Sequence, residues 1–218
     1  MWLTTSSVGR KVVMSLTGLF LILFLTFHVL MNAVAIISLD AYEAVCEFLG
    51  ANWYALVGTA IIAAGFVIHI IYALWLTIQN RKARGNDRYE VSSKPASVEW
   101  ASQNMLVLGI IVLVFLILHL VNFWAKMQLP EVIGQPALSG VDALNAAFSQ
   151  VWLLPLYLIG FAALWFHLTH GFWSALQTLG TTNDKWICRW KCIGWWWATI
   201  VAVLFAVEAC YLTWYFAC

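Results

Sequence analysis

The stretch that decides the fold is Val12–Ile37, VVMSLTGLFLILFLTFHVLMNAVAII, which runs for 26 residues without a charged side chain. At about 1.5 Å per helical residue it can cross the roughly 30 Å of hydrocarbon in a bilayer. Arg10 and Lys11 precede it, as in a signal peptide, and Ala33-Val34-Ala35 resembles a cleavage site. The apolar core of a signal peptide has only about 7–15 residues, however, so we interpret this stretch as a membrane-spanning helix.

Apolar segments of similar length recur along the chain. The predicted spans are 12–38, 52–78, 102–125, 148–178 and 194–216. Of all residues, 63% are hydrophobic and only 10% are charged, whereas a soluble domain carries about 25% charged residues. We therefore predict an all-α integral membrane protein in which residues 1–218 form a single transmembrane domain, a five-helix bundle. The net charge of +1 gives no reason to expect nucleic acid as a partner, and membrane lipid is the expected surrounding.

The basic residues divide unequally between the two ends of this predicted bundle. Ten of the eleven precede the first span or lie between spans two and three or spans four and five. These regions share one side only if the chain crosses five times. Because cytoplasmic loops are enriched in Lys and Arg, we predict a cytoplasmic N-terminus and an external C-terminus. The exception is Lys126, and the ten are Arg10, Lys11, Arg81, Lys82, Arg84, Arg88, Lys94, Lys185, Arg189 and Lys191.

All five histidines lie inside apolar segments: His28, His69, His119, His167 and His170. An ionisable side chain in hydrocarbon is costly, so it normally faces the interior of a helix bundle. A single such histidine is most simply explained by a hydrogen bond between helices. Histidines in four different spans instead indicate a cofactor site, because bundle cores hold cofactors between side chains of facing helices.

Helical rise sorts four of these histidines into two levels. Measured from the predicted cytoplasmic side, His28 lies about 26 Å deep and His119 about 28 Å, whereas His69 lies about 18 Å deep and His167 about 20 Å. Two imidazoles at one depth can bind one haem iron as axial ligands. We therefore predict two b-type haems, one on His28 and His119 and one on His69 and His167. His170, three residues after His167, is an alternative ligand or a group beside the haem.

Other chemistry is less well supported by the sequence. Zinc sites commonly use four close ligands, and there is no HExxH motif or comparable carboxylate cluster. The five cysteines form no CxxC or CxxCH motif, which disfavours covalent haem attachment. Gly65, Gly160 and Gly171 share faces with histidines, where they would admit a porphyrin or let helices pack closely. Glu208, inside the last span, is a functional candidate without an assigned role.

Several motifs together resemble one known family. Ser15-Leu-Thr-Gly-Leu-Phe followed by His28 is similar to its S-x-T-G-L-F…H pattern, and Pro155-Leu-Tyr-Leu precedes His167 by its spacing of twelve residues. The motif His167-x-x-His170-Gly171 is similar to its H-x-x-x-G, which favours His167 as the ligand. Over nearly its whole length the chain resembles the cytochrome b subunit of bacterial succinate:quinone oxidoreductases, of the type with five helices and two haems.

The resemblance implies the membrane anchor of a succinate dehydrogenase or fumarate reductase in the bacterial cytoplasmic membrane, serving the tricarboxylic acid cycle or anaerobic respiration. A flavoprotein subunit would interconvert succinate and fumarate. An iron–sulfur subunit would pass electrons to the proximal haem on His69 and His167. Quinone, expected to be menaquinone, would react near the distal haem on His28 and His119. A dimer of the whole complex would be compatible with this assignment.

The resemblance also points to residues outside the haem ligands. The basic segments 81–94 and 185–191 would form the face that docks the iron–sulfur subunit. Some members use a glutamate after the first span at the quinone site, for which Glu47 is the nearest candidate here, with Glu43 behind it. Others carry a glutamate for proton transfer two residues before the fourth ligand, where this chain has Trp165. That departure puts a transmembrane proton route of the same kind in doubt.

Two alternatives remain open from the sequence. One is a di-haem cytochrome b of another quinone-linked complex, such as a hydrogenase, formate dehydrogenase or nitrate reductase. The other is a haem-free membrane anchor or proton-conducting bundle.

Overall fold

The computed structural model describes residues 2–50, 52–84 and 99–217. Arg88 and Lys94, which belong to the predicted docking face, lie outside these residues. The described part of the chain is helical and contains no strand. Its helices are α1 (Trp2–Thr5), α2 (Ser7–Ile37), α3 (Leu39–Phe48), α4 (Trp53–Arg84), α5 (Trp100–Gln103), α6 (Met105–Asn122), α7 (Gln128–Val132), α8 (Gly140–Phe148), α9 (Leu153–Thr178) and α10 (Asp184–Ala217).

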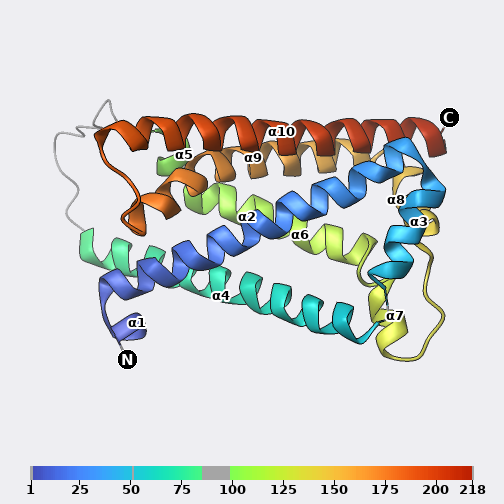
Figure 1. Ribbon diagram of the computed structural model, residues 1–218, viewed down its shortest axis with the longest axis horizontal. Helices are drawn as coiled ribbons and strands as arrows, with labels where there is room; N and C mark the ends of the chain where they lie inside the picture. The colour runs from blue at the N-terminus through green and yellow to red at the C-terminus, as the bar shows by residue number, and fades with distance from the viewer. Residues whose placement is uncertain (1, 51, 85–98, 218) are drawn as a thin grey trace.

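Five of these helices, α2, α4, α6, α9 and α10, are long and apolar enough to cross a membrane. This confirms the prediction of a multi-pass, all-helical chain with five candidate spans. The five run side by side along the length of the molecule and alternate in direction, so the two termini lie at opposite ends (Figure 1). The short helices α3, α7 and α8 gather at the end that holds the C-terminus (Figure 1). We call this the C-terminal end of the bundle, and the opposite one the N-terminal end.

The last span begins ten residues earlier than its apolar sequence predicts, at Asp184 rather than residue 194. Asn183 explains the early start, because its side chain accepts hydrogen bonds from the backbone N–H groups of Lys185 and Trp186 at 3.1 and 3.0 Å and so caps the helix. With 34 residues, α10 is about 51 Å long and exceeds the hydrocarbon thickness. Its first turns therefore project beyond the apolar part of the bundle.

A sharp turn at Ser38 joins the first span to α3. Ser38 has an extended backbone (φ −159°, ψ 125°), and its side chain accepts a hydrogen bond from the N–H of Ala41. Glu43, one turn into α3, accepts hydrogen bonds from the N–H groups of Gly140 and Val141 at 3.1 and 2.7 Å. These N–H groups begin α8, where a carboxylate is favoured by the helix dipole. Glu43 thus ties together two helices nearly 100 residues apart in sequence.

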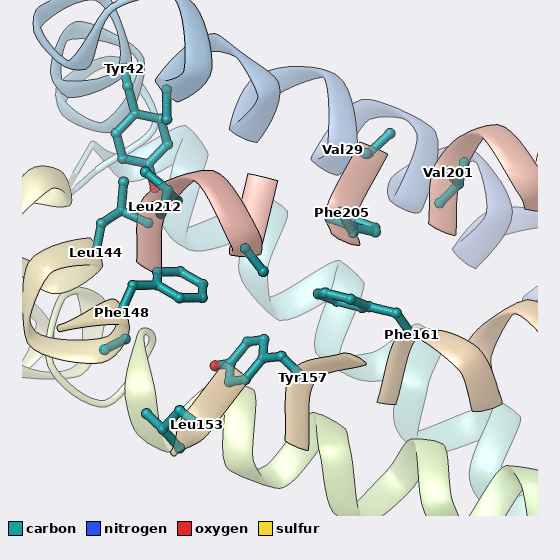
Figure 2. Packing of buried hydrophobic residues seen from close by; sticks show 13 residues of the cluster. Val29, Tyr42, Leu144, Phe148, Leu153, Tyr157, Phe161, Val201, Phe205 and Leu212 are labelled. Atoms are coloured by element: carbon teal, nitrogen blue, oxygen red, sulfur yellow. The ribbon is translucent and has the colours of Figure 1, made fainter. Parts of the chain in front are cut away.

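The core lies among α2, α8, α9 and α10, nearer the C-terminal end, and it is rich in aromatic rings. Phe161 of α9 stacks on Phe205 of α10 with ring centres 5.4 Å apart, and Figure 2 shows the two rings meeting between the helices. Tyr157, one turn before Phe161, receives a hydrogen bond from the side chain of buried Asn122 at 3.0 Å. This bond satisfies a polar pair that burial would otherwise make costly.

Candidate functional site

The structure brings four of the five histidines together in two pairs. His28 of α2 faces His119 of α6, with ring centres 5.7 Å apart and ring planes at 89°. We call these two the α2–α6 pair. His69 of α4 faces His167 of α9, with ring centres 6.4 Å apart and ring planes at 67°. These two are the α4–α9 pair, and all four helices are candidate membrane spans.

Aromatic side chains surround the α2–α6 pair. The ring of His28 stacks on Phe24 at 5.3 Å and lies 6.0 Å from Phe205. On the other side, Phe123 lies 5.0 Å from His119. The amide nitrogen of Asn32 lies 3.3 Å from Nδ1 of His28 and also donates to the carbonyl of His28 at 2.8 Å. The pair therefore lies among aromatic side chains, and Asn32 restricts rotation of one of its rings.

A hydroxyl group orients the α4–α9 pair. Thr17 Oγ1 lies 3.2 Å from Nδ1 of His69, while its own proton is directed to backbone carbonyls of α2. The Thr17 oxygen is then free to accept from an Nδ1–H group, which leaves Nε2 of His69 available as a ligand. The Nδ1 atom of His167 is buried without a hydrogen-bond partner.

The ring separation of each pair is close to that of two imidazoles bound to one iron. Metal–nitrogen bonds of about 2 Å, plus about 1 Å from each nitrogen to its ring centre, place two axial imidazoles about 6 Å apart. The observed separations of 5.7 and 6.4 Å lie on either side of this value. Among the described residues no three His, Cys, Asp or Glu side chains converge on one point. Each pair therefore offers two protein ligands, as a b-type haem requires.

Two glycines on neighbouring helices approach the α4–α9 pair. A Cβ atom added to Gly18 would lie 3.4 Å from Cε1 of His69, and one added to Gly109 would lie 3.7 Å from Cε1 of His167. Hydrogen atoms in place of side chains thus leave room beside both imidazoles. Sequence reasoning did not identify these glycines as neighbours of the histidines. They lie on α2 and α6, and the sequences of α4 and α9 do not show which residues of other helices their histidines contact.

The three glycines selected from the sequence have other surroundings. A Cβ atom on Gly65 would lie 2.6 Å from the ring of Phe20, and one on Gly160 would overlap the ring of Phe115. These two positions serve close packing of α4 on α2 and of α9 on α6. Gly171 has no neighbouring atom within 4 Å of such a Cβ.

His170, three residues after His167, lies in a polar group at the N-terminal end and belongs to neither pair. Its Nδ1 atom is 3.7 Å from a carboxylate oxygen of Glu99, whose other oxygen is 2.8 Å from Nζ of Lys191. Its ring packs against Trp173 with centres 4.9 Å apart, and Lys191 lies over the same indole. Partial burial of Glu99 opposes ionisation, but Lys191 and His170 outweigh it and lower the pKa of this carboxyl group.

An open pocket of about 690 Å³ lies at the C-terminal end of the bundle. It is bounded by the end of α2, by α3, by the start of α8 and by the last turns of α10. Glu47 is exposed at this pocket, while Glu43 lines it and also binds the start of α8. The other residues that line it include Ser38, Asp40, Ser139, Tyr211 and Tyr215. We call it the outer pocket.

Trp165 occupies the position at which some members of the family that the sequence resembles carry a glutamate for proton transfer. Its indole N–H donates to Thr199 Oγ1 of α10 at 2.9 Å. The side chain therefore links α9 to α10.

Comparison of the chain with known protein families, curated proteins and solved structures finds no match.

Proposed function

We propose that this chain is the di-haem cytochrome b anchor of a bacterial succinate:quinone oxidoreductase, passing electrons between an iron–sulfur subunit and membrane quinone. The observation that carries the proposal is the arrangement of four imidazoles from four candidate spans as two facing pairs. Its motifs and their spacing add support, because they resemble those of this family over nearly the whole chain.

In this proposal each pair holds one b-type haem, which supplies reversible one-electron transfer when bound. His28 and His119 hold the distal haem, and His69 and His167 hold the proximal one. Thr17 and Asn32 orient imidazole rings, and the aromatic side chains around His28 and His119 limit the access of water. His170 is a polar neighbour of the proximal site, because its contacts are with Glu99 and Trp173.

The outer pocket is the proposed quinone site. It opens at the end of α2, nine residues beyond His28, and Glu47 is exposed at its mouth. A carboxylate at this position can accept protons as quinol is oxidised, while the electrons pass to the nearby α2–α6 pair. Menaquinone is the proposed physiological quinone.

The positive-inside rule orients the chain in the proposed bacterial cytoplasmic membrane. The N-terminal end then faces the cytoplasm, where exposed Arg81, Lys82, Lys185 and Arg189 offer a surface to the iron–sulfur subunit. The flavoprotein subunit is a partner through that subunit. The outer pocket opens toward the external side.

The test is purification in mild detergent from a native host, followed by identification of the subunits and an absorbance spectrum after dithionite reduction. We expect two b-type haems per chain together with a flavoprotein and an iron–sulfur protein. If the haem-containing chain co-purifies with hydrogenase or formate dehydrogenase subunits, it belongs to another quinone-linked complex. A spectrum without haem bands would refute the proposal.

A further inference from the structure

The side chain of Thr17 in α2 contacts a proposed haem ligand on a neighbouring helix. Its Oγ1 atom lies 3.2 Å from Nδ1 of His69 in α4, although 52 positions separate the two residues in sequence. Both side chains are partly buried. A group that bonds to the far nitrogen of a ligating imidazole does not touch the metal, yet it changes how strongly the imidazole binds it.

The hydroxyl proton of Thr17 is already used within its own helix. Oγ1 donates to the backbone carbonyls of Val13 and Met14 at 2.9 and 3.0 Å, as threonine commonly does one turn back in a helix. The Met14 carbonyl also acts as an acceptor for His69. Both groups of α2 that bond to this ring are therefore acceptors, so the ring must supply the proton from Nδ1. That tautomer leaves the lone pair of Nε2 available to a metal.

The residue after Thr17 contacts the same edge of the ring. A Cβ atom added to Gly18 would lie 3.4 Å from Cε1 of His69, and Cε1 is the ring atom bonded to Nδ1. Because α4 packs along α2, these two consecutive residues form a surface against which the ring lies. The packing of the two helices therefore fixes the ring and its acceptor together, and such support from surrounding groups is what keeps a metal ligand in one geometry.

The other three histidines of the two pairs have different surroundings. Nδ1 of His167 is buried without a hydrogen-bond partner. At Nδ1 of His28 the neighbour is the amide nitrogen of Asn32, which is a donor. The ring of His119 lies among aromatic side chains. An effect of Thr17 on haem iron should therefore be confined to the α4–α9 pair.

We propose that Thr17 is a positioning residue that sets the reduction potential of the haem on the α4–α9 pair, acting through His69. This inference rests on the proposed function. An imidazole whose Nδ1–H group donates a hydrogen bond is a more basic ligand. A more basic ligand favours ferric iron, which carries the higher charge, over ferrous iron, and hydrogen bonds behind the ligand are one means by which proteins tune haem iron. Loss of the Thr17 acceptor should therefore raise the midpoint potential of this haem alone.

The experiment measures the midpoint potentials of both haems by redox titration of the intact complex. Thr17→Val keeps the branched shape of the side chain and removes its oxygen. The α4–α9 haem, identified as the one missing from His69→Ala, should shift upward by about 59 mV for each tenfold loss of preference for ferric iron. Thr17→Ser retains a hydroxyl group and should keep the wild-type potential. Thr77→Val is the matched control, because Thr77 of α4 makes the same kind of bond, to the Ala73 carbonyl at 2.8 Å, and its loss should shift neither haem.

An unchanged α4–α9 potential in Thr17→Val, with both haems retained, would overturn the inference and leave the proposed function standing. Equal shifts of both haems would also overturn it, because Thr17 contacts one ligand only. If Thr17→Val loses the α4–α9 haem, Thr17→Cys decides, since a thiol is a weak acceptor of hydrogen bonds. Its potential should lie above that of Thr17→Ser, and equal potentials contradict the inference. A wild-type complex without haem would instead overturn the proposed function itself.

Discussion

At the scale of single residues, the two histidine pairs have different supporting groups. Thr17 can fix the tautomer of His69, because its oxygen accepts while its own proton is used elsewhere. His28 is held by Asn32 and by stacking on Phe24. His170 differs from all four, since a carboxylate and an indole already surround it.

This difference gives a prediction about haem content. Replacing any one of His28, His69, His119 or His167 by alanine should remove one of two haems, which halves the haem measured per protein. His170→Ala should retain both, because its ring contacts Glu99 and Trp173. Reduced spectra of the purified variants provide the measurement. Two haems in His167→Ala, with one in His170→Ala, would exchange the roles of these two residues.

At the scale of helices, close contacts at small residues determine how the spans approach each other. Gly160 of α9 lies directly against the ring of Phe115 of α6, whereas Gly171 of the same helix has open space beside it. Both are helical glycines, so their intrinsic conformational cost is the same. A difference in stability between alanine variants at these two positions therefore reflects how α9 packs on its neighbours.

Gly160→Ala should therefore lower stability while Gly171→Ala should not. The added methyl group at position 160 forces Phe115 to move, and overpacking of this kind costs about 1–3 kcal/mol. At position 171 the substitution replaces glycine by a better helix former without a clash. Thermal unfolding midpoints in one detergent measure both. Equal midpoints for the two variants would contradict the packing of α9 on α6 described above.

The connection between α3 and α8 gives a second prediction at this scale. Glu43→Ala removes the acceptor of two backbone N–H groups at the start of α8, and hydrogen bonds to a charged group contribute about 1.5–3 kcal/mol. Glu47→Ala, on the same helix but exposed, should change stability by no more than about 0.5 kcal/mol. Unfolding midpoints of the two variants separate a structural carboxylate from one that is free to act at the pocket.

At the scale of the whole molecule, the odd number of candidate spans places the two termini at opposite ends (Figure 1). The cytoplasmic assignment of the N-terminal end depends on the distribution of basic residues. Cys188 and Cys192 are exposed on the first turns of α10. Their accessibility to reagents therefore shows on which side of the membrane the N-terminal end lies. They lie beyond the apolar part of the last span.

A membrane-impermeant thiol reagent tests this orientation in a variant in which Cys46, Cys210 and Cys218 are replaced by serine. We expect labelling of Cys188 and Cys192 in inside-out vesicles from which the peripheral subunits have been removed, and none in intact spheroplasts. Detergent-solubilised protein serves as the control for reactivity, because both sides are then accessible. The reverse pattern would invert the orientation of the chain and move the proposed quinone pocket to the cytoplasmic side.

The sequence alone determined the number of candidate spans and the location of all five histidines within them. Lipid imposes a long apolar run on every spanning helix, so these features are local and can be read residue by residue. The ends of the spans were less predictable. The start of α10 depends on the cap that Asn183 supplies, and hydropathy does not register such a cap.

Only the tertiary structure decided which groups surround each histidine. Gly18 and Gly109 lie beside the α4–α9 pair although they belong to other helices, and Glu43 binds α8 although 97 residues separate it from Gly140. The same holds for Glu208, which is only 6% exposed because other helices pack against α10. The physical reason is that such contacts depend on how each helix is rotated and packed. Side chains from the whole bundle fix that arrangement together.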